Sequence, residues 1–170
     1  MDPLILTLRL VHILSGTLWV GIAAFNPFFL MPALREAGPE GGKVMAVLQR
    51  RGLMTLLPLL ALFNILSGLG LLWLVSGRSA HFFTSPAGHT LSTGAALAFI
   101  AFVIGMVVTR PAMLRAGTAM QSLSPGTPDE ERTRVMAEVQ RLRGRGARSA
   151  QVVAVLLLLA AGLMAVWRYV

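Results

Sequence analysis

The chain has 170 residues, which is the size of one domain and excludes a large multidomain enzyme. Hydrophobic residues make up 55% of it and charged residues 13%, with a mean hydropathy of +0.72, whereas a soluble domain carries about 25% charged residues. The absence of cysteine excludes disulfides, thiolate metal ligands and a cysteine nucleophile. The apolar residues fall into four long blocks, so the composition predicts a polytopic membrane protein.

Each block is long enough to cross a hydrocarbon core of roughly 30 Å, which takes about 20 apolar residues in a helix. The third helix is expected to start near Pro86, because proline suits a first helical turn. We therefore expect an all-α, polytopic membrane four-helix bundle that forms a single transmembrane domain over residues 1–170. Its expected spans are residues 4–34, 52–77, 86–114 and 149–169, joined on one side by loops 35–51 and 115–148.

The distribution of basic residues predicts the orientation. Twelve of the fifteen Lys and Arg residues lie in segments 35–51 and 110–148, and the other three lie at the opposite ends of the spans. The positive-inside rule then makes both segments cytoplasmic and both termini external, as in a multi-pass protein of the bacterial inner membrane. No aromatic residues alternate with these arginines, so the net charge of +8 does not indicate a nucleic-acid partner. The first apolar run lacks a preceding basic stretch and a cleavage site, and is therefore expected to be a retained span.

Two irregular regions are expected. Residues 124–148 begin with turn-forming residues and continue with Val135, Val139 and Leu142 on one helical face. This pattern predicts a turn followed by a short amphipathic helix on the membrane surface. Prolines within the apolar blocks predict a bend or an end of the first span at Pro27 and Pro32, as well as a kink in the second span.

The first and third spans share a motif. Residues 12–15 read His-Ile-Leu-Ser and residues 89–92 read His-Thr-Leu-Ser, and each histidine precedes a Pro-Ala pair by 20 or 22 residues. With both spans running inward, this spacing places the two histidines within about 3 Å of the same depth. The match favours a two-fold repeat of helix pairs, although leucine-rich helices also produce such short matches by chance.

The histidines are the main candidates for chemistry, because ionisable groups inside a span are costly and usually mark function. Small residues lie one turn beyond His12 and His89, where a flat macrocycle needs room. Two histidines at matched depth on different helices predict the axial ligands of a haem b. Arginines at the outer rim would pair with its propionates. The expected site comprises His12, His89, Gly16, Trp19, Thr93, Arg9 and Arg78.

Several alternatives stay open. His12 and His89 could instead form interhelical hydrogen bonds, and His81 is the reserve ligand in the loop. Nine methionines offer soft ligands for copper, but they form no tight cluster. In the second span, Asn64 and Ser67 indicate a helix-packing seam or a hydrogen bond to quinone or to the haem edge.

The first span resembles the first helix of the CopD/HemJ-like four-helix membrane superfamily, which groups copper-resistance membrane domains with haem-containing protoporphyrinogen oxidases. The resemblance rests on His12, Trp19, Gly21, Phe28 and Pro32 over about 25 residues. It implies a haem b held by the first-helix histidine and by a lysine early in the third helix. This chain has His89 at about that place and no lysine there, which separates it from the oxidase pattern.

These observations together predict a haem b-binding membrane protein that transfers electrons, linked to quinol or placed within a respiratory assembly. A bis-histidine iron is coordinatively full, which favours electron transfer over substrate binding. The alternatives are a protoporphyrinogen oxidase-like enzyme, a copper-transport protein and a cofactor-free accessory subunit. Expected partners are the lipid bilayer, quinone or a redox protein, and either a second copy or a larger complex.

Overall fold

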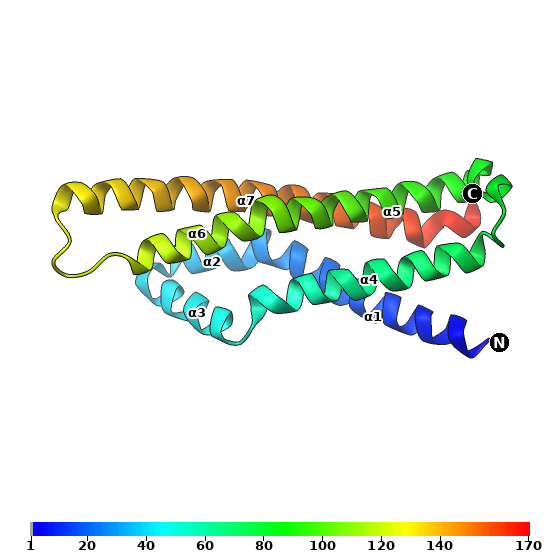
Figure 1. The fold of residues 1–170 in the computed structure, drawn as a ribbon, viewed down its shortest axis with the longest axis horizontal. Helices are drawn as coiled ribbons and strands as arrows, with labels where there is room; N and C mark the ends of the chain where they lie inside the picture. Colours follow the sequence, from blue (N-terminus) through cyan, green and yellow to red (C-terminus); the bar gives the residue numbers. More distant parts are fainter. Residues whose placement is uncertain (1) are drawn as a thin grey trace.

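The computed structural model describes residues 2–170, and this part of the chain is all-α (Figure 1). Seven α-helices are interrupted by two π-helical turns, η1 and η3, and by two 3₁₀ turns, η2 and η4. In chain order the elements are α1 (Pro3–Phe25), η1 (Asn26–Leu30), α2 (Met31–Glu36), α3 (Gly38–Arg50), α4 (Leu53–Val75), η2 (Ala80–Thr84), α5 (Pro86–Ile104), η3 (Gly105–Thr109), α6 (Arg110–Gln121), α7 (Asp129–Val166) and η4 (Trp167–Tyr169).

Four continuous helical stretches are long and apolar enough to cross a membrane. They span Pro3–Glu36, Leu53–Val75, Pro86–Gln121 and Asp129–Tyr169. The expectation of an all-α chain with four such helices is confirmed. The third stretch begins at Pro86, where the Ser85 hydroxyl accepts a hydrogen bond from the Gly88 N–H and caps the helix.

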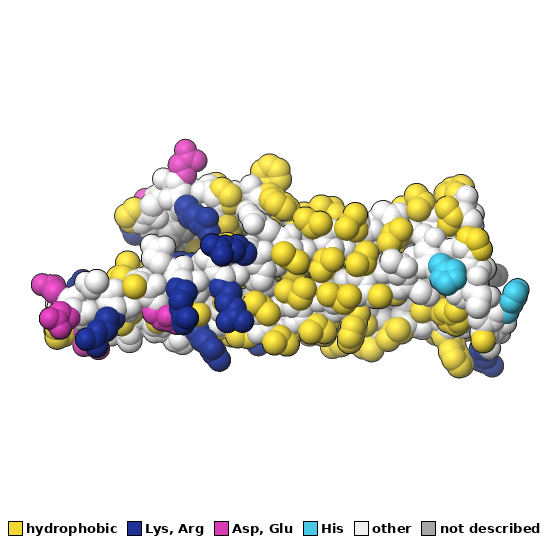
Figure 2. All heavy atoms as spheres, turned by 90° about the horizontal axis from the view of Figure 1, so that it is seen from above, with side chains coloured by type: hydrophobic (Ala, Val, Ile, Leu, Met, Phe, Trp, Pro, Cys, Tyr) yellow, Lys and Arg dark blue, Asp and Glu magenta, His cyan; other side chains and the backbone are white. Residues whose placement is uncertain are grey.

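The outer surface of the described chain is apolar along the middle of the long helices. Figure 2 shows hydrophobic side chains covering this region, whereas most of the Lys, Arg and acidic side chains that are visible gather at one end. Large side chains such as Ile13 (61% exposed) and Leu14 (63%) point outward, and the inner core consists mainly of small residues. Such an inverted distribution suits helices surrounded by lipid, where small residues allow backbones to approach closely.

The long helices pack as two pairs that meet through α7. The first pair is α1 with α4 and the second is α5 with α7. Helix α7 also contacts α1, and α4 touches α5 more sparsely. The two termini lie at one end of the molecule, and α3 and the α6–α7 connection lie at the other (Figure 1).

The first span contains a π-helical turn rather than an end. The ring of Pro32 would clash with the carbonyl of Phe28, four residues earlier, in a regular α-helix. The chain widens instead, and the Met31 N–H bonds to Asn26 O, five residues back. The expected irregularity near Pro27 and Pro32 therefore takes the form of η1, after which the helix continues as α2.

The third span repeats this construction. Pro111 stands four residues after Val107, and the Arg110 N–H bonds to Gly105 O across η3. Each π-helical turn is thus followed by one residue and a Pro-Ala pair, in keeping with the motif shared by the two spans. Pro58 has no such turn, since α4 is assigned as one continuous helix.

The region after the third span differs from the expectation. Residues 129–148 do not form a separate surface helix but the first half of α7, which continues into the fourth span without a break. The apolar face of this half is buried, with Val139 at 0% and Leu142 at 8% exposure, and α6 packs against α7. The apolar stripe that suggested a lipid contact therefore serves helix packing. Within the expected loop 35–51, α3 is also helical.

Candidate functional site

His12 is held against α4 by hydrogen bonds in both directions. Its Nδ1 lies 2.9 Å from the backbone oxygen of Asn64, and the side-chain Nδ2 of Asn64 donates to His12 O at 2.8 Å. A carbonyl oxygen can only accept, so Nδ1 carries the proton and Nε2 keeps its lone pair. Within residues 2–170, Nε2 has no hydrogen-bond partner. The arrangement leaves one basic nitrogen of a half-buried imidazole available.

Two glycines allow this close approach of α1 and α4. A Cβ added at Gly68 would lie 2.8 Å from His12 Cε1, and a Cβ at Gly16 would lie 2.6 Å from Asn64 Nδ2. Gly16 was expected to make room for a macrocycle, but in the structure it makes room for the asparagine amide. Asn64 thus lies in a helix-packing seam, which was one of the two readings of this residue, and we call its contact with His12 the polar clasp.

A cavity of about 570 Å³ lies beside His12, bordered by α1, α4, α5 and the end of α7. We call it the histidine cavity. Its walls are mostly aliphatic, and the lining side chains that differ in chemistry are Arg9, His12, Asn64, Phe99, Met164 and Trp167. The volume falls within the range of about 300–1,000 Å³ that is typical of cofactor and ligand sites.

His89 does not join His12 in this cavity. It is exposed on the first turn of α5, and it is not among the residues that line the cavity. Thr93, one turn further, is also exposed and outside. Although the shared motif places both histidines toward the same end, α1 packs mainly on α4 whereas α5 packs mainly on α7. Depth was inferred from spacing, but the direction in which each side chain points depends on helix rotation.

The remaining expected residues are also dispersed. The Arg78 guanidinium lies 5.8 Å from the ring centroid of Trp73, outside the histidine cavity. Trp19 is buried in the core at 5% exposure. His81 is exposed in η2, with its Nδ1 3.5 Å from Thr84 Oγ1. Of the seven expected cofactor-binding residues, only His12 and Arg9 line the histidine cavity.

The structure adds site residues that sequence reasoning missed. Gly68 lies against the imidazole, and Met164 and Trp167 line the same cavity from the end of the fourth span. A signal for Gly68 existed in the sequence, because the Asn-Ile-Leu-Ser-Gly run at 64–68 repeats the His-Ile-Leu-Ser-Gly run at 12–16. No such signal distinguished Met164 from the other methionines.

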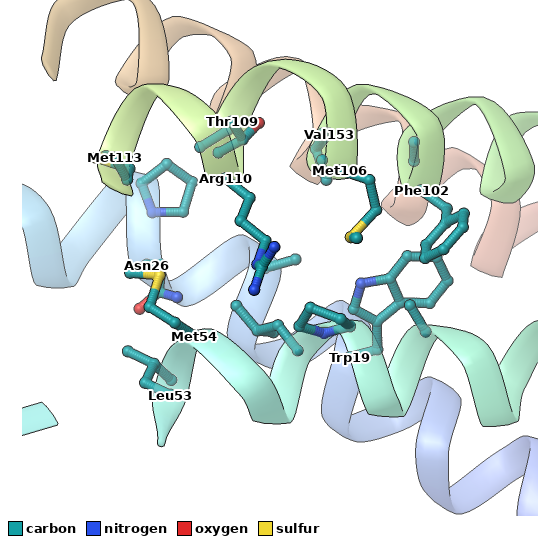
Figure 3. A pocket seen from close by; sticks show the side chains of 18 of the residues that line it. Trp19, Asn26, Leu53, Met54, Phe102, Met106, Thr109, Arg110, Met113 and Val153 are labelled. Atoms are coloured by element: carbon teal, nitrogen blue, oxygen red, sulfur yellow. The ribbon is translucent and has the colours of Figure 1, made fainter. Parts of the chain in front are cut away.

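A second cavity, of about 150 Å³, lies toward the basic end, between η1, α4, η3 and α7. We call it the methionine cavity, because Met31, Met54, Met106 and Met113 line it. Figure 3 shows Arg110 extending into it, with Trp19 at one side and Asn26 at the other.

Among the residues that the structure describes, no group of three or more His, Cys, Asp or Glu side chains could hold a metal ion. A metal at His12 would therefore need further ligands from another source, such as a porphyrin or a thioether. The chain matches no protein-family model, no curated protein sequence and no solved structure. Function must accordingly be inferred from the chemistry of the sites.

Proposed function

We propose that this chain is a multi-pass protein of the bacterial inner membrane that binds haem b in the histidine cavity and takes part in electron transfer. The observation that carries the proposal is the 2.9 Å contact of His12 Nδ1 with Asn64 O. Histidines that bind a metal commonly donate their other ring N–H to a carbonyl or carboxylate, which fixes the tautomer and the ring orientation. The free Nε2 of His12 is therefore prepared to bind iron.

The rest of the histidine cavity is compatible with a porphyrin. Its volume of about 570 Å³ and its aliphatic walls suit a large, flat, apolar ligand. Arg9 is the one charged residue that lines it, and a guanidinium pairs well with a propionate carboxylate. When bound, haem supplies one-electron redox chemistry to the site. The apolar walls would exclude water from the ring, and His12 would hold the iron.

Met164 takes the place of His89 in this proposal as the further side chain that would hold the haem together with His12. It is the one other lining side chain with a donor atom that commonly binds haem iron, whereas His89 lies outside. A His/Met pair would raise the reduction potential above that of a bis-histidine haem. With His12 and Met164 both holding the group, the chemistry that we propose is electron transfer rather than substrate oxidation at the metal.

The visible spectrum of the detergent-purified protein tests the proposal. We expect a Soret band and sharp bands in the reduced state. His12→Ala should abolish these bands, and His89→Ala, the matched control at the same end of the molecule, should leave them unchanged. Met164→Leu should retain haem but open one coordination position, so the reduced variant should bind carbon monoxide.

Three outcomes would overturn this assignment. A colourless, stable protein would point to the cofactor-free accessory subunit. Copper without iron in metal analysis would favour the copper carrier, since His12 and Met164 are suitable Cu(I) ligands. Loss of haem in His89→Ala as well as in His12→Ala would indicate that both histidines bind the haem.

The proposed orientation, with both termini outside, rests on the charge distribution. Figure 2 shows most of the visible Lys and Arg side chains at one end, and histidine side chains at the other. The basic end carries α3 and the α6–α7 connection, and the positive-inside rule makes it cytoplasmic. In this orientation the histidine cavity lies toward the external face, where an electron-transfer partner or quinol would approach.

A further inference from the structure

Arg110 forms no ion pair in the part of the chain that the structure describes. Its guanidinium extends into the methionine cavity (Figure 3), and no Asp or Glu lines that cavity. The ion pairs among residues 2–170 are Lys43–Glu40 and Arg141–Glu138, and neither involves Arg110. Arg110 is an exposed residue at the first position of α6, so an anion that enters the cavity from outside can reach its guanidinium. The cation is therefore available to an anionic ligand.

Asn26, which also lines this cavity, has a side chain with unused hydrogen-bonding groups. The Asn26 side chain lines the cavity and makes no hydrogen bond in the described part of the chain. The Thr109 hydroxyl, in contrast, is already used, since it donates to Ser149 Oγ at 3.0 Å. A guanidinium and a carboxamide thus offer several unused donors to the same cavity.

Both π-helical turns border this cavity. Asn26 and Pro27 come from η1, and Gly105, Met106 and Thr109 come from η3. Such turns are rare and frequently occur at functional sites. Their position shows that the irregularities of the first and third spans converge on one place, between helices that would otherwise continue regularly.

The remaining lining is apolar and adaptable. Four methionines border the cavity, and unbranched thioether side chains adjust readily to ligands of different shape. The volume of about 150 Å³ is that of a cavity that holds a benzene-sized molecule. It accommodates a small headgroup with its first few methylenes, while a longer tail would extend beyond it.

From these observations we propose that the methionine cavity binds the anionic headgroup of a single-chain or double-chain amphiphile. Arg110 pairs with its carboxylate or phosphate, the Asn26 amide donates a further hydrogen bond, and the methionines contact the adjoining methylenes. Fatty acids and acidic phospholipids share this chemistry. The site is separate from the histidine cavity and does not depend on haem.

Quenching of Trp19 fluorescence tests the proposal, because Trp19 lines the methionine cavity. The other two tryptophans are replaced in a Trp73→Phe/Trp167→Phe background, and the protein is titrated with a fatty acid brominated near its carboxylate. We expect saturable quenching. Arg110→Gln should raise the half-quenching concentration at least about tenfold, because it removes a charge-assisted hydrogen bond. Arg115→Gln is the matched control, since Arg115 is exposed on α6 like Arg110 but does not line the cavity.

The source of the headgroup is resolved in lipid nanodiscs. If brominated phosphatidylglycerol quenches Trp19 and this quenching depends on Arg110, whereas brominated phosphatidylcholine does not quench, the ligand is an acidic phospholipid. Quenching by the fatty acid alone would identify a free carboxylate. Equal quenching in the parent, Arg110→Gln and Arg115→Gln would overturn the proposal, as would quenching that never saturates. If Arg110→Gln does not fold, Arg110→Lys and Asn26→Leu replace it. An unchanged affinity for the brominated fatty acid in both variants would also overturn the proposal.

Discussion

In the histidine cavity the key polar side chain is held by the protein itself, whereas in the methionine cavity Arg110 forms no ion pair with any described residue. His12 exchanges hydrogen bonds with Asn64 across α1 and α4, so its ring is oriented before any ligand arrives. Arg110 is exposed, and it extends into the methionine cavity without an ion pair among residues 2–170. The contrast indicates that one end is preorganised for a ligand that needs a fixed geometry, and that the other suits a ligand that brings charge.

The largest effect is expected from a substitution at Gly68, because it would displace the His12 ring from its position against α4. An alanine Cβ there would lie 2.8 Å from His12 Cε1, and the ring can move away only by losing its bond to Asn64 O. We expect Gly68→Ala to destabilise the protein by about 1–3 kcal/mol through overpacking and to lower the content of the proposed haem. Thermal unfolding in detergent and the Soret absorbance measure both effects.

Gly21→Ala is the control for this substitution. Nothing lies within 4 Å of a Cβ added at Gly21, on the same helix as His12. It should be neutral or stabilising by up to about 1 kcal/mol, since alanine favours a helix over glycine. Equal melting temperatures for the two variants would show that the imidazole is not held against α4.

A smaller effect is expected from Asn64→Leu. The substitution removes the amide that donates to His12 O but keeps the backbone carbonyl that accepts from Nδ1. Interhelical hydrogen bonds in membranes contribute about 0.6–2 kcal/mol, so the unfolding free energy should fall by that amount while haem is retained in part. Denaturation by a graded detergent series would measure the loss.

Ser92→Ala provides the matched polar-to-apolar change on α5. Its hydroxyl oxygen is buried without a hydrogen-bond partner in the described chain, and removing such a group is neutral or stabilising. A loss for Ser92→Ala as large as that for Asn64→Leu would mean that the clasp contributes nothing specific.

The smallest effect concerns the basic end, at the exposed pair Glu138–Arg141. Both guanidinium contacts of Glu138 are 2.8 Å long, and the hydrogen bond from Arg141 lowers the pKa of Glu138 below its ordinary value of 4.5. A lowered folded-state pKa contributes stability above the ordinary value, and this is lost as the pH falls through the lowered pKa. Exposed pairs contribute little, so Glu138→Gln should lower Tm slightly at pH 7 and not at all in strong acid.

Circular dichroism melts at both pH values check this expectation. Glu36→Gln serves as the control, because Glu36 is exposed and has no ion pair among residues 2–170. A difference between Glu138→Gln and Glu36→Gln that grows on acidification would contradict the assigned direction of the pKa shift.

Much of the fold was predictable from the sequence, and little of the site was. Pro86 and Ser85 mark the start of the third span by local chemistry alone, and Pro32 and Pro111 mark the irregular turns. Residues 129–148 were assigned to the membrane surface because their amphipathic pattern does not say whether lipid or α6 covers the apolar face. Likewise, the spacing of His12 and His89 indicates their depth but not their directions.

The sequence by itself determined that this chain has four long apolar helices and a basic end, because hydropathy and charge are sums over local residues. The tertiary structure was needed to show that His12 faces Asn64 and that His89 lies outside the histidine cavity. It was also needed to show that Arg110 extends into the methionine cavity. These relations depend on how far each helix is rotated about its axis. Close contacts between distant glycines and their partners, such as Gly16 with Asn64 and Gly68 with His12, set that rotation.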